Sequence, residues 1–143
     1  MALFTSVNYA KNGMTVSEIL LPDTNIVADY FNGIEEAVSL INSLDPQRIA
    51  ISVITYTEFL AGFDDPEEQN NFNLFVDRCL YFSIVKTTAQ IAANLKRQYR
   101  WKLPDAYQAA IAVEHKMTLL TRNTKDFNPS IHKFVKIPYK LRQ

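Results

Sequence analysis

Five polar residues of this 143-residue chain are spaced so that they follow or flank short apolar strands. Asp23 ends the first predicted strand, Glu58 lies one helical turn after the second, and Asp105 lies in the first turn of the helix before the fourth. Asn123 and Asp126 follow the end of that fourth strand. Ligands of open α/β sheets bind beyond the carboxyl ends of the strands, so we expect these side chains to share one cleft.

Oxygen ligands in one cleft indicate a particular chemistry. Several carboxylates in close contact stay ionised only when cations neutralise them. A set of oxygen ligands without His or Cys favours Mg²⁺ or Mn²⁺ over zinc. Carboxylate-held Mg²⁺ beside a phosphate backbone activates water and stabilises the departing oxygen. The sequence therefore predicts metal-dependent phosphodiester hydrolysis, with Mg²⁺ as the cofactor and Mn²⁺ as a substitute.

Each acidic residue also has a structural interpretation that the sequence leaves open. Asp23 could begin an Asx-turn. Residues 55–58, TYTE, match the S/T-x-x-E pattern of a capping box, in which Glu58 would cap its own helix. Asp105 could complement the dipole of the helix that it begins. The prediction of a site therefore rests on the joint placement of these residues.

The elements that must position these side chains alternate between strand and helix. The expected strands are 19–21, 48–54, 81–86, 117–121 and, short, 134–137. The expected helices are 26–44, one opened by Thr55 and ending at Gly62, one begun at 64–66, one opened by Thr87 or Thr88, and 104–116. This order predicts a three-layer α/β/α sandwich with a mostly parallel central sheet of four to five strands. Residues 1–18 are expected to form an extension, and 19–143 a single domain.

Composition and sequence patterns exclude several classes of protein. The single cysteine, Cys79, rules out an internal disulfide and a cysteine-based zinc site, and we expect it in the core. The longest apolar run, 109–113, is far too short to span a membrane, and no secretory signal begins the chain. We therefore expect a soluble, cytoplasmic protein without a membrane partner. His115 and His132 stand alone and are expected at the surface or in packing.

The net charge of zero hides an asymmetry along the chain. Residues 1–93 carry four Lys/Arg against twelve Asp/Glu, whereas 94–143 carry eleven against three. A basic region beside an acidic centre suits a polyanion such as RNA, although two solvated surfaces would give the same pattern. Trp101 could stack on bases or be buried at a helix end. The candidate RNA-binding residues are Lys96, Arg97, Arg100, Lys102 and Arg122.

Four segments resemble the motifs of one known family. LLPDTN at 20–25 looks like the opening signature of the PIN-domain ribonucleases, and SVITYTEFLAG at 52–62 resembles their second acidic motif. LPDA at 103–106 with AAIA at 109–112 is similar to the third, and LLTRNTKDF at 119–127 to the closing segment. The resemblance covers residues 19–137 in order, and the nearest branch is the VapC-type toxins of type II toxin–antitoxin pairs.

The resemblance implies a function and a set of site residues. It implies a Mg²⁺- or Mn²⁺-dependent endoribonuclease, a hydrolase, that forms a homodimer and is bound by a cognate antitoxin. Asp23, Glu58 and Asp105 would be the catalytic residues and metal ligands. Asn25 and Thr121 would support them by hydrogen bonding.

One position departs from the family pattern. Where relatives often carry a fourth acid, this chain has Asn123, whose amide oxygen can bind a metal or hold a metal-bound water without adding charge. Asp126 is the candidate replacement. The departure leaves open a degenerate PIN domain that binds RNA or protein without catalysis. A receiver domain or an Asp-nucleophile phosphatase fits less well, since the phosphatase needs a second Asp where Asn25 stands.

Overall fold

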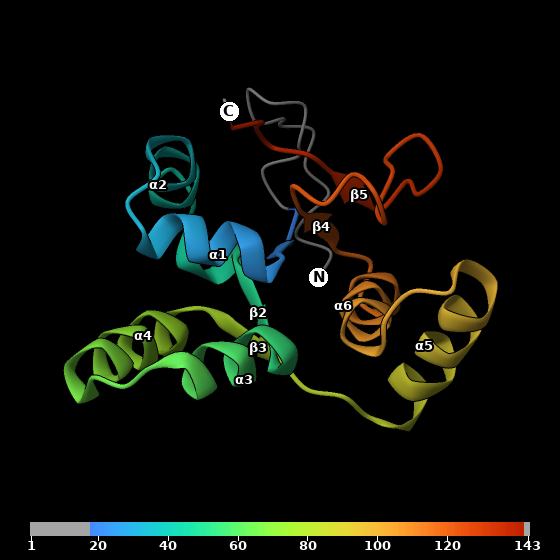
Figure 1. The fold of residues 1–143 in the computed structure, drawn as a ribbon, viewed down its shortest axis with the longest axis horizontal. Coiled ribbons are helices and arrows are strands. Elements are labelled where there is room, and N and C mark those ends of the chain that lie inside the picture. The colour runs from blue at the N-terminus through green and yellow to red at the C-terminus, as the bar shows by residue number, and fades with distance from the viewer. Residues whose placement is uncertain (1–17, 142–143) are drawn as a thin grey trace.

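The computed structural model describes residues 18–141, so the extension predicted at 1–18 lies almost wholly outside the described residues. The strands are β1 (Leu20–Pro22), β2 (Ala50–Ser52), β3 (Leu80–Phe82), β4 (Thr118–Leu120) and β5 (Val135–Lys136). The helices are α1 (Thr24–Phe31), α2 (Glu35–Asn42), the short 3₁₀ helix η2 (Pro46–Arg48), α3 (Val53–Gly62), α4 (Pro66–Arg78), α5 (Lys86–Tyr99) and α6 (Leu103–Glu114). Figure 1 shows their arrangement.

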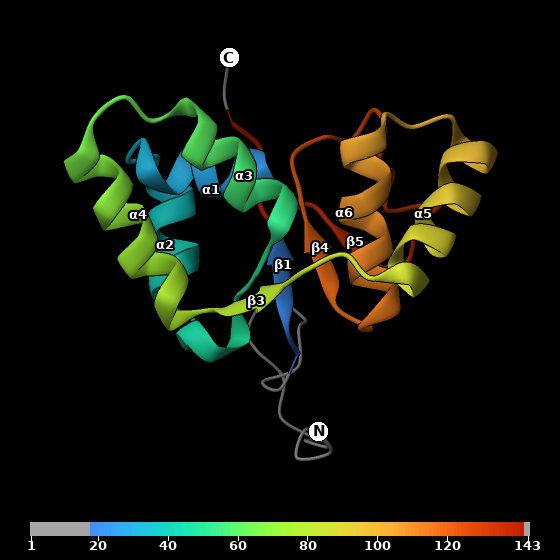
Figure 2. The same cartoon turned by 90° about the horizontal axis from the view of Figure 1, so that it is seen from below.

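All strand pairs of the described chain are parallel. Strands β1, β4 and β5 form one ladder in the order β1-β4-β5, and β2 pairs with β3. A bridge between Leu20 and Ile49 joins the two ladders, which gives the order β3-β2-β1-β4-β5. Figure 2 shows the strands between α1 to α4 on one side and α5 with α6 on the other. The predicted α/β sandwich with a parallel sheet is confirmed.

The register of the sheet brings the predicted site elements to one edge. Pro22 at the end of β1 pairs with Leu120 at the end of β4, and the amide of Asp23 donates to the Leu120 carbonyl at 2.7 Å. Helices α1 and α3 begin within two residues of the ends of β1 and β2. Because the strands are parallel, the chain leaves β1, β2 and β4 at the same edge of the sheet.

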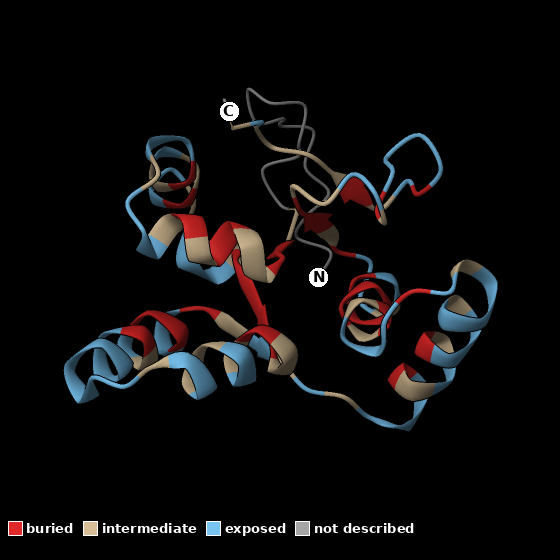
Figure 3. Cartoon of the chain, in the orientation of Figure 1, coloured by how far each residue is buried: buried red, intermediate tan, exposed pale blue. Residues whose placement is uncertain are grey.

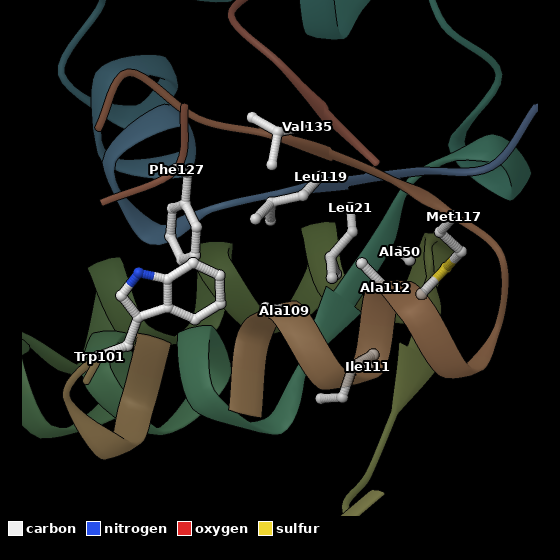
Figure 4. Packing of buried hydrophobic residues seen from close by; sticks show 10 residues of the cluster. All are labelled: Leu21, Ala50, Trp101, Ala109, Ile111, Ala112, Met117, Leu119, Phe127 and Val135. Atoms are coloured by element: carbon white, nitrogen blue, oxygen red, sulfur yellow. The ribbon is translucent and has the colours of Figure 1, made fainter. Parts of the chain in front are cut away.

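Two apolar clusters hold this arrangement together. In the first, Leu21 and Leu119 of the sheet pack on α6, and the Trp101 ring lies beside that of Phe127 (Figure 4). The second is aromatic, and its centre is Phe72, stacked at 4.8 Å between ring centroids on Phe59. Buried residues run along β1, β2 and β4 and through α6, whereas those of the edge strand β3 are partly or fully exposed (Figure 3). Both faces of the sheet are therefore covered.

Three predicted helix boundaries are wrong. Neither Thr87 nor Thr88 opens α5, which begins at Lys86 with Val85 as its N-cap. The helix expected at 26–44 is interrupted between α1 and α2, where Gly33 adopts a φ of 77°, a left-handed conformation that suits glycine. Thr55 does not open α3, because Ser52 is the N-cap and its hydroxyl accepts from the Thr55 amide at 3.1 Å. The predicted start of α4 is confirmed, with Asp65 as its N-cap.

Residues 18–141 hold no helix that is both long and apolar enough to cross a membrane. Cys79 is buried in the aromatic cluster, as expected, and its burial raises the pKa of the thiol to about 11.

Substituting Phe72→Ala is expected to lower the free energy of unfolding by about 4 kcal/mol, because the ring is fully buried among other rings. The matched control is Leu74→Ala on the same helix, where the side chain is 55% exposed and the change should stay within about 0.5 kcal/mol. Urea unfolding followed by circular dichroism measures both. Equal losses for the two variants would contradict the assignment of this core.

Candidate active site

Asp23 is the most constrained of the predicted site residues. It follows β1, caps α1, and is only 7% exposed. Its Oδ1 accepts from the Thr24 amide at 2.9 Å and from Gln108 Nε2 at 3.1 Å. Its Oδ2 accepts from Thr121 Oγ1 at 2.8 Å and from Asn25 Nδ2 at 3.4 Å. Donors from three parts of the chain thus fix this carboxylate in one orientation.

Glu58 lies in the second turn of α3 and is exposed. Its Oε1 accepts from the hydroxyl of Thr24 at 2.6 Å, so the carboxylate is tied to the first residue of α1. The capping-box interpretation of Glu58 is excluded, because α3 begins at Val53 and is capped by Ser52. Glu58 is therefore free of a capping role and faces the end of β1.

Asp105 lies in the first turn of α6 and is half-buried. Burial, and after it the negative charges of Asp23, Asp126 and Glu58 in that order, raise the pKa of its carboxyl to about 6. The ammonium of Lys102 acts in the opposite direction. The fold therefore brings the four predicted carboxylates into one electrostatic neighbourhood.

The loop after β4 folds back on itself. Asn123 Nδ2 donates to Asp126 Oδ2 at 3.0 Å, and the Asp126 amide donates to Asn123 Oδ1 at 3.2 Å. The Asn123 amide donates to Thr121 Oγ1 at 3.0 Å. This pairing orients the Asp126 carboxylate, and its charge reaches Asp105 across the cleft.

A cavity of about 330 Å³ lies between these elements, lined among others by Asp23, Glu58, Asp105 and Asn123. The donor set fits Mg²⁺ or Mn²⁺, since it is made of carboxylate and amide oxygens and carries an excess of negative charge. Within residues 18–141, however, no three His, Cys, Asp or Glu side chains stand close enough to hold an ion together. The hydrogen bond from Thr24 ties Oε1 of the Glu58 carboxylate to the first residue of α1, beside Asp23.

The predicted basic residues fall into two groups. Lys96, Arg97, Arg100 and Lys102 are exposed at the end of α5 and in the connection to α6. Arg122 instead forms a bidentate ion pair with Asp29, at 2.6 and 3.0 Å, which holds its guanidinium against α1.

Aromatic residues beside the basic ones are packed rather than free. Trp101 is 4% exposed, and its ring stacks on Tyr99 at 4.8 Å and contacts His132. Its Nε1 donates to the Asp126 carbonyl at 3.1 Å. The stacking of Trp101 on bases is therefore excluded, and the alternative, a buried aromatic at a helix end, is correct. His132 is 6% exposed against Tyr99 and Trp101, so of the two roles expected for it packing is the correct one, and its burial lowers the pKa of the imidazole.

Sequence reasoning missed four polar residues around the site: Thr24, Asp29, Thr55 and Gln108. Gln108 is 1% exposed and bonds to Asp23. The sequence does indicate a role for Gln108. It lies three residues after Asp105, on the same side of an alanine-rich helix, where a buried polar side chain needs a hydrogen-bond partner. Asp29 gave no such signal, since its partners Arg122 and Tyr139 come from distant parts of the chain.

Asp105→Asn is expected to stabilise the metal-free protein at pH 7. The pKa of Asp105 is about 6 in the folded state against 3.8 in the unfolded state, so folding favours the protonated form. The wild type therefore loses stability as pH rises from about 4 to about 6, and the advantage of the uncharged Asn variant grows over the same range. Because the group is half-exposed, we expect a difference of about 1 kcal/mol at pH 7. Urea unfolding of both proteins from pH 4 to pH 7.5 measures it, and parallel pH profiles would contradict the charge repulsion at Asp105.

The chain is similar to known proteins both in sequence and in fold. The family model described as PIN domain matches residues 20–128. The chain is similar to a chain of a toxin–antitoxin complex from Klebsiella pneumoniae, with 34% identity, a TM-score of 0.77, and coverage of 85% of this chain and 99% of that chain. It is also similar to a chain of FitAcB from Neisseria gonorrhoeae, with 26% identity, a TM-score of 0.66, and coverage of 86% and 100%.

A chain of DNA-bound VapBC from Salmonella typhimurium shares the fold, with 20% identity, a TM-score of 0.67, and coverage of 77% of this chain and 90% of that chain. A comparison with curated protein sequences finds no match.

Proposed function

The chain belongs to the PIN domain family, and from that premise we propose that it is a Mg²⁺- or Mn²⁺-dependent endoribonuclease. We propose further that it is the VapC-type toxin of a toxin–antitoxin pair, as the similar complexes suggest. The proposal includes an RNA substrate, a cognate antitoxin, a homodimer and a cytoplasmic location. Its main support is that the carboxylates of Asp23, Glu58 and Asp105 line one cavity, where the charges of the other two raise the pKa of Asp105.

Asp23 and Asp105 would be the two main ligands of the cation. Asp23 would be the fixed ligand, because its donors hold the carboxylate oxygens in place. Asp105 would be the second, and it must give up its proton, which a pKa of about 6 makes easy at neutral pH. A bound Mg²⁺ would supply an activated water and charge stabilisation at the scissile phosphate.

Glu58 and Asn123 would act on water molecules at the site, and Asp126 would add negative charge beside them. Glu58 is exposed and is positioned to orient an attacking water or to complete the ligand set. Asn123 would hold water through its amide without adding charge, and the paired Asp126 would add the missing negative charge nearby.

Positive charge beside the cleft would guide the substrate. Lys102 is exposed, and its ammonium lowers the pKa of Asp105, so it lies near the acidic cavity. With Lys96, Arg97 and Arg100 it forms a basic region at the end of α5. Such a region suits the phosphate backbone of RNA next to the carboxylates.

A second candidate function is a binding module without catalysis. Asn123 favours it, because an amide stands where many relatives carry an acid, and the described residues hold no compact three-ligand cluster. This protein would bind RNA without needing a divalent cation. Measuring Mn²⁺ binding separates the two candidates.

Asp23→Asn and Asp105→Asn are each expected to reduce RNA cleavage by more than about 100-fold, because each removes a negatively charged ligand. The matched control is Asp77→Asn on the exposed face of α4, which should cleave like the wild type. Cleavage of a mixed panel of RNAs is measured with Mg²⁺, with Mn²⁺ and with EDTA. Full activity of either site variant, or cleavage in EDTA, would refute the assignment.

Lys102→Ala is expected to weaken RNA binding and to lower the salt dependence of that binding. Losing one phosphate contact changes the slope of log K against log salt by about 0.7 on single-stranded RNA. Binding is measured by fluorescence anisotropy in Ca²⁺ at several salt concentrations. Lys116→Ala, in the turn after α6, is the control for a general charge effect. Unchanged salt dependence for Lys102→Ala would remove this residue from the RNA-binding region.

A further inference from the structure

The buried amide of Gln108 is hydrogen-bonded directly to the acidic site. It lies one turn after Asp105 on α6 and is 1% exposed. Its Nε2 donates to Asp23 Oδ1 at 3.1 Å and to Thr55 Oγ1 at 2.9 Å. Its Oε1 accepts from Ser52 Oγ at 2.5 Å. One buried amide thus joins the ends of β1 and β2 to α6.

The orientation of this amide is fixed by its neighbours. Oδ1 of Asp23 is an acceptor in both of its hydrogen bonds, so the nitrogen of Gln108 faces it. On the opposite side, the Ser52 hydroxyl accepts from the Thr55 amide and therefore has its proton available for Gln108 Oε1. Turning the amide over would place its oxygen against the Asp23 carboxylate.

The same amide reaches Glu58 through two threonine hydroxyls. Thr24 Oγ1 donates its single proton to Glu58 Oε1 at 2.6 Å. Thr24 Oγ1 and Thr55 Oγ1 are 3.0 Å apart, so the Thr55 hydroxyl must be the donor in this pair. Thr55 Oγ1 accepts in turn from Gln108. The hydrogen bonds therefore run in one direction from Gln108 through Thr55 and Thr24 to Glu58.

We propose that Gln108 is a positioning residue that orients Asp23 directly, and Glu58 through Thr55 and Thr24, at the cavity where a divalent cation would bind. This inference rests on the proposed function, since it concerns the same site. One N–H of the amide bonds to Asp23 and the other to Thr55, which leads to Glu58. A single side chain therefore fixes the orientation of the two acids relative to each other. Removing the amide leaves Asp23 Oδ1 with the Thr24 amide and leaves the Thr55 hydroxyl free to turn.

The test compares Mn²⁺ affinity, measured by electron paramagnetic resonance, in variants of the full chain. Gln108→Met, of similar length and without the amide, should bind Mn²⁺ at least about tenfold more weakly than the wild type. The control is Thr88→Val, which removes another fully buried hydroxyl, bonded to Glu114 at the far end of α6. It should lower the melting temperature and leave Mn²⁺ affinity unchanged.

Thr24→Val tests the connection from Gln108 to Glu58, because Thr24 is the last hydroxyl before Glu58. Thr24 is only half-buried, so this test stands even if Gln108→Met fails to fold. It should weaken Mn²⁺ binding severalfold, whereas Thr24→Ser, which keeps the hydroxyl, should restore most of the affinity. Combining Thr24→Val with Gln108→Met should weaken binding by less than the product of the single effects, because both act on one chain of hydrogen bonds.

Three outcomes would overturn the inference. Wild-type affinity in Gln108→Met would remove its positioning role while leaving the proposed nuclease standing. Equal affinity in Thr24→Val and Thr24→Ser, or multiplicative effects in the double variant, would break the connection to Glu58. Absence of Mn²⁺ binding by the wild type itself would refute the metal site, and the proposed function with it.

Discussion

The buried carboxylate of Asp23 is the point on which the site depends. A carboxylate that is 7% exposed must have its oxygens satisfied, and here the donors come from α1, α6 and the end of β4. Those donors can meet only if β1 and β4 pair in register and α6 packs against them. The need to satisfy one buried charge thus ties the core packing to the geometry of the site.

The remaining acids follow from that constraint. Asp105 is carried to the cleft by the same helix that brings Gln108 to Asp23, and Glu58 is held by the threonine that follows Asp23. The resulting repulsion is visible in the raised pKa of Asp105. Clustered carboxylates with a perturbed pKa are typical of functional sites, and a divalent cation is the ligand that we propose to neutralise them here.

Much of this could be predicted from the sequence, because alternating strands and helices leave few arrangements and put Asp23, Glu58 and Asp105 at one edge. The positive φ of Gly33 is a local exception that helical spacing does not reveal, and the capping role of Ser52 was hidden by the TYTE pattern at 55–58. Pairings between distant residues could not be predicted, since the sequence does not say which donor reaches which acceptor. The ion pair of Arg122 with Asp29 is such a case.

The central claim is that Asp23 and Asp105 bind one divalent cation together. A crystal of the protein soaked in Mn²⁺ would test it through the anomalous scattering of the metal. The account predicts an anomalous peak in the cavity, about 2.1 Å from an oxygen of Asp23 and from an oxygen of Asp105. A cavity without a peak at saturating Mn²⁺, or a peak held by other residues, would contradict it.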